Sequence, residues 1–265
     1  MLLLPQTFVA CCQAQMLSKG GRCKTFDDSA SGYARGEGVG SHALERLGSS
    51  SRAVMSELRG SALNQDGRSS NLTSPNGPSQ QAVVLSALAE AQVSPASHLC
   101  VETHGTGTAL GDPMEVGALQ TALGVSGRQR PLQLGAAKTN VGHLEGGAGM
   151  VGLLKLASLL SRNCLPANLH LHDLNSHIFE DIEDFAVQFQ SESCPSSSFP
   201  CASVSSFGFG GTNGHVVLAA TALQAEKKGR RAVKAQPHAA PKTVAFLFTG
   251  QGSQYVNMGK ELYGS

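Results

Sequence analysis

The amino-acid sequence predicts a layered α/β fold. Short apolar runs typical of strands alternate with segments of helical periodicity along most of the chain. Hydrophobic residues make up 41% of the 265 residues, which is enough for a sizeable core. There are also 31 glycines, a share above the usual ~7%, and they cluster in short motifs that indicate tight turns around a site.

Composition excludes several classes of protein. The formal net charge is +1, so no bulk field recruits nucleic acid. None of the seven cysteines forms a Cys-x-x-Cys pair, which excludes a zinc ribbon and a thioredoxin motif and favours a reduced, cytoplasmic setting. The first residues lack the basic region of a signal peptide, and the longest apolar stretch, 150–160, is too short to span a membrane. We therefore expect a soluble protein without a membrane partner.

The first third of the chain predicts two strands and a helix. Residues 41–47 and 53–63 mix small, polar and apolar residues in a way that favours strands. Residues 64–78 are rich in turn formers, so they form either a solvated surface loop or a loop that lines a pocket mouth. Apolar residues at helical spacing then predict a helix over 78–93.

The next elements lead to a short helix with a clear start signal. Residues 99–101 are apolar and predict a buried strand that runs into His104. A helix is expected over 113–123, with Asp112 as its N-cap and Glu115 at the capping-box position.

The remaining elements continue the alternation. Residues 132–136 predict a strand ending near Lys138, and residues 146–162 are apolar nearly all round, which indicates a buried helix. Further strands are expected at 185–189, 202–206 and 215–218. The glycine-rich segment 207–214 is either a plain hairpin turn or a mobile loop that approaches a ligand.

Three histidines lie together in one loop. His170, His172 and His177 could bind a metal ion on spacing alone. No carboxylate or cysteine pattern completes such a site, so we expect no metal.

The character of the chain changes after residue 219. Residues 220–242 combine basic residues with alanine, glutamine and proline, which predicts a linker. A basic run can also bind nucleic acid, but no aromatic residues for stacking lie beside it. Residues 243–265 begin with a strand and a glycine turn, which indicates the start of a second domain.

Two histidine motifs are the strongest candidates for a site. His104 lies in Val-Glu-Thr-His-Gly-Thr-Gly-Thr and His143 in Lys-Thr-Asn-Val-Gly-His. Taken singly, each histidine is more often structural, but two histidines and Lys138 in glycine-framed motifs favour a shared site. We expect the imidazoles to face one pocket and to stabilise negative charge. The dipole of the helix after His143 and the charge of Lys138 should keep the imidazoles neutral.

These motifs resemble the ketosynthase domain of modular polyketide synthases. The similarity is carried by residues 102–108, 111–115, 138–149 and 205–216, and the loop 64–80 is also similar. It covers 1–219, which corresponds to the C-terminal portion of a ketosynthase. Residues 243–262 resemble the opening of a malonyl-type acyltransferase, with Gly-Gln-Gly-Ser-Gln at 250–254.

The resemblance implies a thiolase-like fold, present here as an incomplete C-terminal half, and a β-ketoacyl synthase activity. Such enzymes join a malonyl-type thioester to an acyl chain by a decarboxylative Claisen condensation. The two histidines that stabilise the enolate would be His104 and His143. Lys138 matches the lysine that orients the first histidine, with Glu115 as its ion-pair partner and Asp112 in support. Fatty-acid synthases share this chemistry, but the Asn-Gln-Asp-Gly loop and the linker favour a polyketide system.

The resemblance also implies partners. Thr106 and Thr108 match threonines that hold the phosphopantetheine arm of an acyl carrier protein, so no cofactor is bound directly. Phe209 matches a gating phenylalanine, and Gln251 matches an oxyanion-hole residue of the acyltransferase. The other expected partners are the remaining ketosynthase and acyltransferase segments and a second copy of the full protein.

The sequence departs from the family at the nucleophile. No Thr-Ala-Cys-Ser-Ser motif is present, and we expect Cys11 and Cys12 to be buried thiols. The Gly-x-Ser-x-Gly elbow of an acyltransferase is absent as well. As an isolated fragment the chain is therefore expected to be inactive. The alternative is a catalytically inactive remnant that binds a carrier protein or another partner.

Overall fold

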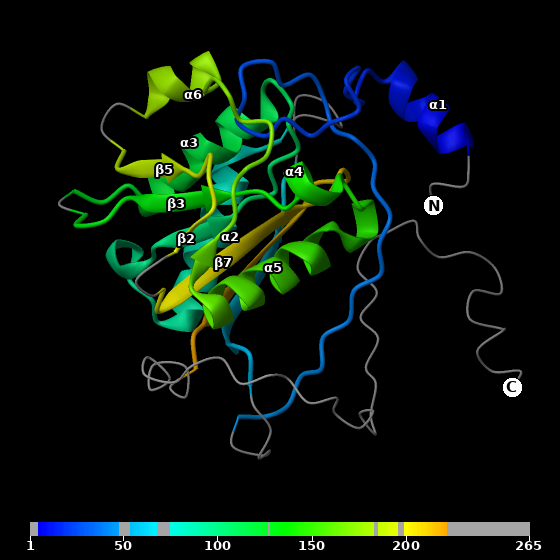
Figure 1. Ribbon diagram of the computed structural model, residues 1–265. Helices are drawn as coiled ribbons and strands as arrows, with labels where there is room; N and C mark the ends of the chain where they lie inside the picture. The colour runs from blue at the N-terminus through cyan, green and yellow to red at the C-terminus, as the bar shows by residue number, and fades with distance from the viewer. Residues whose placement is uncertain are drawn as a thin grey trace, which may run out of the picture.

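The computed structural model describes residues 5–47, 54–67, 75–126, 128–182, 185–195 and 199–221. A six-stranded sheet with the order β1-β8-β7-β2-β3-β5 forms its centre (Figure 1). The expected linker from residue 222 onward and the expected second domain, with Gln251, lie outside the described residues. The sheet strands are β1 (Glu57–Gln65), β2 (Cys100–Glu102), β3 (Leu132–Gly135), β5 (Val187–Phe189), β7 (Cys201–Phe207) and β8 (Thr212–Ala219).

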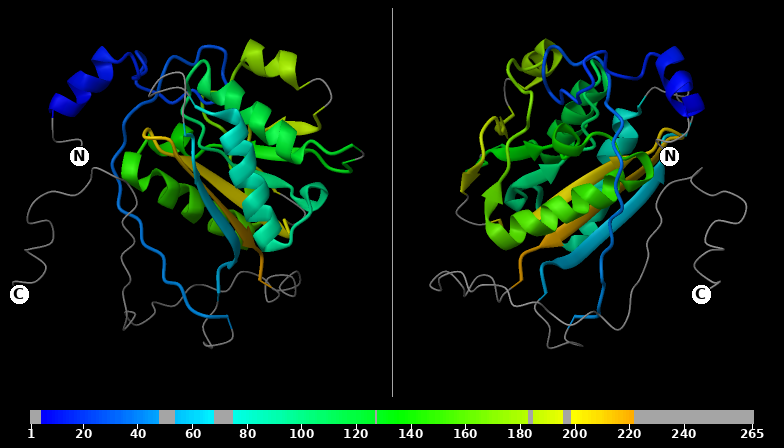
Figure 2. Two further views of the ribbon diagram at one scale, coloured as in Figure 1. Left: turned by 180° about the vertical axis from the view of Figure 1, so that it is seen from behind. Right: turned by 45° about the vertical axis from the view of Figure 1, so that its right-hand side comes forward.

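Helices cover the sheet on both faces, which gives three layers (Figures 1 and 2). Helix α5 (Ala148–Arg162) packs on one face, and α2 (Gly77–Ala91) and α3 (Gly111–Leu123) pack on the other. The predicted layered α/β architecture is therefore confirmed. The smaller elements are α1 (Pro5–Gln13), η1 (Pro95–Ser97), α4 (Lys138–Val141), η2 (Glu145–Gly147), α6 (Ser176–Asp181) and the pair β4 (Cys164–Leu165) and β6 (Cys194–Pro195).

Strand direction decides where the functional loops lie. β7, β2, β3 and β5 run parallel to one another, whereas β8 runs antiparallel to both of its neighbours, β7 and β1. Carboxyl ends of parallel strands meet at one edge of a sheet, and ligands commonly bind there. The segments that follow β2, β3 and β7 are therefore brought to the same edge.

Most predicted elements are confirmed within a few residues. α2 begins after Asn76, whose side chain accepts a hydrogen bond from the Ser79 N–H, and ends before Gln92 in the left-handed conformation. The helix predicted over 146–162 is preceded by the short η2 turn, so α5 itself begins at Ala148. β2 and β3 are fully or largely buried, as their apolar sequences predicted.

The strand predicted over residues 41–47 is wrong. Residues 41–47 form no strand, and Leu44 and Leu47 among them are exposed. The preceding residues 33–40, called the strap below, lie closely against α4 and α5, because Gly36 and Gly40 allow the approach. A Cβ atom on Gly36 would lie 2.2 Å from the carbonyl oxygen of Val141, and one on Gly40 would lie 2.5 Å from Cγ of Met150.

Helix α5 is less buried than its composition predicted. Its inner face includes Leu156, Leu159 and Leu160, which are nearly inaccessible, but Leu154 on the outer side is 37% exposed. α5 is thus a one-sided helix rather than one surrounded by core. Within the described residues, no helix is both long enough and apolar enough to cross a membrane.

Candidate active site

The candidate site lies at the carboxyl edge shared by β2, β3 and β7. His104 follows β2, Lys138 follows β3 at the start of α4, and Phe207 ends β7. The glycine after His104 has a φ of +45°, and a Cβ atom there would lie 2.7 Å from Oγ1 of Thr103. Gly105 therefore allows the chain to turn sharply at the end of β2 and leaves His104 at the edge of the sheet.

The two imidazole rings are neighbours. The ring centroids of His104 and His143 are 5.6 Å apart and the rings meet edge to face at 83°. The expectation that both histidines share one site is supported by this contact. Both side chains are partly buried, so each keeps some access to solvent.

Backbone donors fix the tautomer of both rings. Nδ1 of His104 accepts a hydrogen bond of 3.2 Å from the Phe207 N–H, and Nδ1 of His143 accepts one of 2.9 Å from the Glu145 N–H. A neutral imidazole that accepts at Nδ1 carries its proton on Nε2. Each ring is therefore prepared to donate one N–H to a ligand.

Burial keeps both rings neutral. Desolvation lowers the pKa of His104 well below its usual value, and the positive charge of Lys138 lowers it further. Desolvation also lowers the pKa of His143 to about 3, with smaller contributions from Lys138 and Arg35. The expected direction is confirmed, but its main cause is burial rather than the dipole of the following helix.

Lys138 is buried beside His104. Its Nζ donates to the main-chain carbonyl of His104 and lies 3.4 Å from the Nδ1 atom of the same residue. Desolvation lowers the pKa of Lys138, whereas the negative charges of Glu115 and Glu102 oppose this effect. The lysine thus contacts both the backbone and the ring of His104.

The expected roles of Glu115 and Asp112 are wrong in their details. Within the described residues, Glu115 forms no ion pair with Lys138; its two carboxylate oxygens accept the N–H groups of His104 and Gly105 at 2.7 and 2.9 Å. Asp112 does not cap α3, which begins after Leu110 without a side-chain cap. Both carboxylates instead hold loop backbone, because several buried N–H groups near them need acceptors.

Asp112 connects two distant segments. Its carboxylate accepts the N–H of Phe26 at 2.9 Å and that of Gly107 at 3.1 Å. Sequence motifs alone do not indicate the partner in the first thirty residues. The loop after His104 is therefore held by one carboxylate at each end, Glu115 near its start and Asp112 near Gly107.

The other expected site residues surround this loop. The hydroxyls of Thr106 and Thr108 lie 3.2 Å apart, and that of Thr108 also accepts the Gly111 N–H. Phe209 is 55% exposed in the turn between β7 and β8. Phe207, which the sequence motifs did not single out, is nearer, with its ring centroid 5.5 Å from that of His104.

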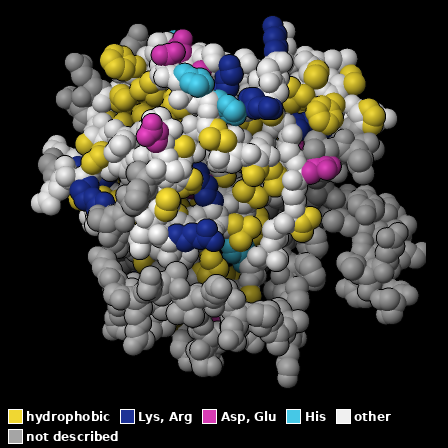
Figure 3. All heavy atoms as spheres, in the orientation of Figure 1, with side chains coloured by type: hydrophobic (Ala, Val, Ile, Leu, Met, Phe, Trp, Pro, Cys, Tyr) yellow, Lys and Arg dark blue, Asp and Glu magenta, His cyan; other side chains and the backbone are white. Residues whose placement is uncertain are grey.

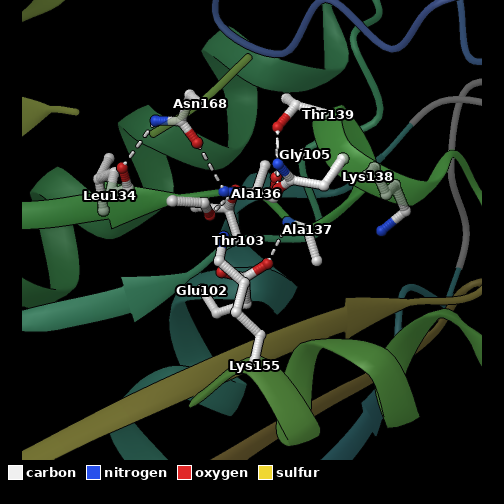
Figure 4. A network of polar contacts seen from close by, with 12 residues as sticks. Glu102, Thr103, Gly105, Leu134, Ala136, Ala137, Lys138, Thr139, Lys155 and Asn168 are labelled. Atoms are coloured by element: carbon white, nitrogen blue, oxygen red, sulfur yellow. Dashed lines mark hydrogen bonds and ion pairs between the residues drawn. The ribbon is translucent and has the colours of Figure 1, made fainter. Parts of the chain in front are cut away.

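A buried ion pair that the motifs did not indicate supports the loop after β3 (Figure 4). Glu102 at the end of β2 pairs with Lys155 of α5 at 2.7 Å and also accepts the Ala137 N–H. Asn168 joins the same loop by accepting the Ala136 N–H at 2.9 Å and donating to the Leu134 carbonyl at 3.1 Å. The one sequence signal is a carboxylate at the end of an otherwise apolar strand.

The remaining histidines and cysteines lie elsewhere. His172 and His177 are exposed, and within the described ranges no three His, Cys, Asp or Glu side chains gather as a metal site. The expectation of buried thiols at Cys11 and Cys12 is wrong, since Cys11 is half-buried and Cys12 is exposed on α1. Over the face drawn in Figure 3, hydrophobic side chains lie among charged side chains of both signs.

A buried histidine, His215, is expected to make the free energy of unfolding depend on pH. Nε2 of His215 is buried and has no hydrogen-bond partner among the residues that the structure describes, and desolvation lowers the pKa of His215 to about 3. Between pH 6.5 and 3 the unfolded state binds a proton here that the folded state does not, so this group reduces stability as the pH falls. His215→Ala should make the free energy of unfolding less dependent on pH in this range, by at most about 1.4 kcal/mol per pH unit.

Urea unfolding of both proteins at pH 6.5, 5.5 and 4.5 measures this difference. Asp112 and Glu115, whose pKa values burial raises to about 6 and about 7, act in the opposite direction but are common to both proteins. Equal slopes in the two proteins would contradict a neutral, buried His215.

Sequence comparisons connect the chain with one family. A profile described as "Beta-ketoacyl synthase, C-terminal domain" matches residues 55–172, and one described as "Beta-ketoacyl synthase, N-terminal domain" matches residues 1–49. The chain is 43% identical over 222 residues to a phenolphthiocerol/phthiocerol polyketide synthase of Mycobacterium tuberculosis. It is 46% identical over 224 residues to erythronolide synthase EryA2 of Saccharopolyspora erythraea. These matches cover 82% and 81% of the chain but 10% and 6% of those relatives.

Solved structures agree on the fold. The ketosynthase from module 6 of the bacillaene synthase of Bacillus subtilis 168 superposes with a TM-score of 0.76 at 32% identity, over 83% of this chain and 41% of that one. An oxazolomycin ketosynthase domain, OzmH KS7 of Streptomyces albus JA3453, gives 0.74 at 29% identity, over 82% and 39%. The chain thus has the thiolase-like ketosynthase fold over part of the domain.

Proposed function

The chain belongs to the β-ketoacyl synthase family of modular polyketide synthases, and we propose that its two-histidine site decarboxylates a malonyl-type thioester during chain extension. The observation that carries the proposal is the pair of neutral imidazoles, each with Nδ1 occupied by a backbone N–H and the proton on Nε2. Two such donors stabilise an oxyanion in a site that excludes water.

The proposed reaction proceeds through an enolate. The thioester carbonyl oxygen accepts hydrogen bonds from Nε2 of His104 and of His143. The bond between the α-carbon and the carboxylate breaks, and carbon dioxide leaves. The electron pair of that bond forms an enolate, whose oxygen stays hydrogen-bonded to both rings. The enolate carbon attacks the acyl thioester on a cysteine, a carbon–carbon bond forms, and the cysteine thiolate leaves, so the extended chain remains on the thioester that carried the malonyl group.

Lys138 and the two buried carboxylates are proposed to position His104. The lysine contacts its backbone carbonyl and ring, and Glu115 holds the N–H groups of His104 and Gly105. The positive charge of Lys138 also disfavours a protonated imidazole and contributes to the lowered pKa of His104. A protonated imidazole would bind the substrate carboxylate and oppose its loss, so neutrality favours the reaction.

The acyl chain is proposed to be carried by a cysteine of the ketosynthase region that this chain does not cover. Among the described residues, burial raises the pKa of Cys23, Cys100 and Cys201, which keeps these thiols protonated and unreactive. The matched ketosynthase structure is covered over 41% of its length, so other parts of that fold are available for the nucleophile.

The substrate arm is proposed to enter past the threonine loop. Thr106 and Thr108 are partly exposed, and their hydroxyls can hydrogen-bond the amides of a phosphopantetheine arm from an acyl carrier protein. Phe209 is exposed beside this edge and is proposed to cover the arm once it is bound. The phosphopantetheine supplies the thioester; the residues of this chain orient its carbonyl.

The wider assembly is proposed from the sequence. Residues 220–242 act as a linker and 243–265 begin a malonyl-type acyltransferase, in which Gln251 contributes to the oxyanion hole. The full protein is proposed to work as a cytoplasmic homodimer with its own carrier and acyltransferase domains.

Conversion of malonyl-pantetheine to acetyl-pantetheine tests the proposal. The full natural polypeptide that carries this sequence is incubated with the malonyl thioester, and the products are identified by mass spectrometry. Because decarboxylation requires the enolate site rather than the acyl-cysteine, carbon dioxide release is expected even when no acyl donor is present. Binding of carrier protein without decarboxylation would instead favour the inactive binding module.

A further inference from the structure

An ion pair that the histidine motifs do not include, between Arg35 and Glu145, lies beside His143. Arg35, from the extended segment near the N-terminus, has no exposed side-chain surface. Its Nε and one terminal nitrogen donate to the two carboxylate oxygens of Glu145 at 2.6 and 3.0 Å. This two-pronged contact is among the stronger hydrogen-bond geometries in proteins and fixes the position of the Glu145 side chain.

Glu145 also contacts His143 through its backbone. Its N–H donates to Nδ1 of His143 at 2.9 Å, which is the contact that places the imidazole proton on Nε2. The backbone at Glu145 has a φ of +51°, a left-handed conformation that a residue with a side chain rarely adopts. Such strain persists where surrounding contacts hold it, and here the contact to the side chain is the Arg35 pair.

The segment that carries Arg35 holds the histidine backbone as well. The His143 N–H donates to the Ala34 carbonyl at 2.7 Å, and the Gly36 N–H donates to the His143 carbonyl at 2.9 Å. The rings of Tyr33 and His143 meet edge to face with centroids 4.9 Å apart. The strap therefore fixes the His143 main chain through both its N–H and its carbonyl. Arg35 in turn holds Glu145, whose N–H contacts the His143 ring.

We propose that Arg35 and Glu145 are positioning residues for His143: their ion pair holds Glu145 in the left-handed conformation, and the Glu145 N–H then keeps the His143 proton on Nε2. Neither residue touches the substrate. The inference rests on the proposed function, because a fixed Nε2–H donor matters only if it binds the thioester oxygen.

A pair of double variants separates this role from simple structural support. Arg35→Met combined with Glu145→Gly removes both charges but leaves a residue that adopts a positive φ without strain. Arg35→Met combined with Glu145→Ala removes the same charges but leaves a residue for which this conformation is strained. The two proteins differ by one methyl group, so both substitutions remove nearly the same tertiary interactions.

Histidine-selective ¹⁵N NMR and malonyl-pantetheine decarboxylation are then measured on the full natural polypeptide. The glycine variant should keep the Nε2–H tautomer of His143 and a kcat within about threefold of the wild type. The alanine variant should lose the single tautomer and about fivefold to thirtyfold in kcat, with KM changed less than twofold. The signals of the buried His98 and His215 serve as internal controls of folding.

Equal tautomer populations and equal kcat values in the two double variants would overturn the proposal. If the alanine variant does not fold, Arg35→Lys gives the second test, because it keeps the charge but cannot make the two-pronged contact. It should mix the His143 tautomers, and an unchanged ¹⁵N spectrum would again overturn the proposal. A wild-type protein that shows the Nε2–H tautomer but no decarboxylation would contradict the proposed function and leave the positioning role supported.

Discussion

His104→Ala is expected to slow decarboxylation of malonyl-pantetheine by about 10²–10³-fold. The substitution removes one of two N–H donors to the enolate oxygen, and loss of one oxyanion donor has an effect of this order. kcat should fall much more than KM rises, because the donor is needed most when negative charge develops on the oxygen. Stopped assays of acetyl-pantetheine formation in the full natural polypeptide measure both constants.

Two further variants make the result specific. His177→Ala removes an exposed histidine of α6 and should leave the rate unchanged. His104→Ala combined with His143→Ala should cost less than the product of the two single losses, because both rings act on one oxygen. A wild-type rate in His104→Ala, or independent losses in the double variant, would contradict a shared oxyanion site.

Glu102→Met should lower the free energy of unfolding by about 3–5 kcal/mol. The change leaves Lys155 without its partner in a site where the lysine side chain is only 14% exposed. It also leaves the Ala137 N–H, at the start of the loop that carries Lys138, without its acceptor. Urea unfolding followed by far-ultraviolet circular dichroism measures the loss.

The matched control is Glu102→Met combined with Lys155→Met. Replacing both members of a buried ion pair with apolar side chains of similar size is often nearly neutral, so the double variant should regain most of the lost stability. It should still be less stable than the wild type by about 1–3 kcal/mol, because the Ala137 N–H stays unpaired. A double variant as unstable as Glu102→Met would show that the unpaired Lys155 is not the main cause of the lost stability.

Sequence patterns predicted the elements whose signals are local. Apolar periodicity predicted α2, and short apolar runs predicted β2 and β3, because burial dominates these elements. The motif around His104 indicated a site at a strand end, and the parallel pairing of β2 and β3 brings Lys138 to the same edge. The closeness of the two histidines was thus a reasonable expectation that the structure supports with a centroid distance of 5.6 Å.

The errors concern contacts between distant parts of the chain. Asp112 satisfies a capping pattern, yet its carboxylate accepts a hydrogen bond from the Phe26 N–H, 86 residues away in the sequence. A buried backbone N–H without an acceptor is costly in free energy, and Asp112 provides that acceptor. Residues 41–47 resemble a strand, but a strand requires a hydrogen-bonded neighbour, and among the described residues no strand pairs with this mostly exposed segment. Arg35 and Glu145 are 110 residues apart, so their pairing leaves no local signal.

The central claim is that the two imidazoles donate to one carbonyl oxygen, and infrared spectroscopy of that carbonyl tests it most directly. A malonyl thioester analogue that cannot decarboxylate, labelled with ¹³C at the thioester carbonyl, is bound to the full natural polypeptide, and an isotope-edited difference spectrum is recorded. The carbonyl stretch should lie at lower frequency than that of the analogue in water and should return toward the free value in the double variant lacking both rings. A bound analogue with the free frequency in the wild-type protein would contradict the account.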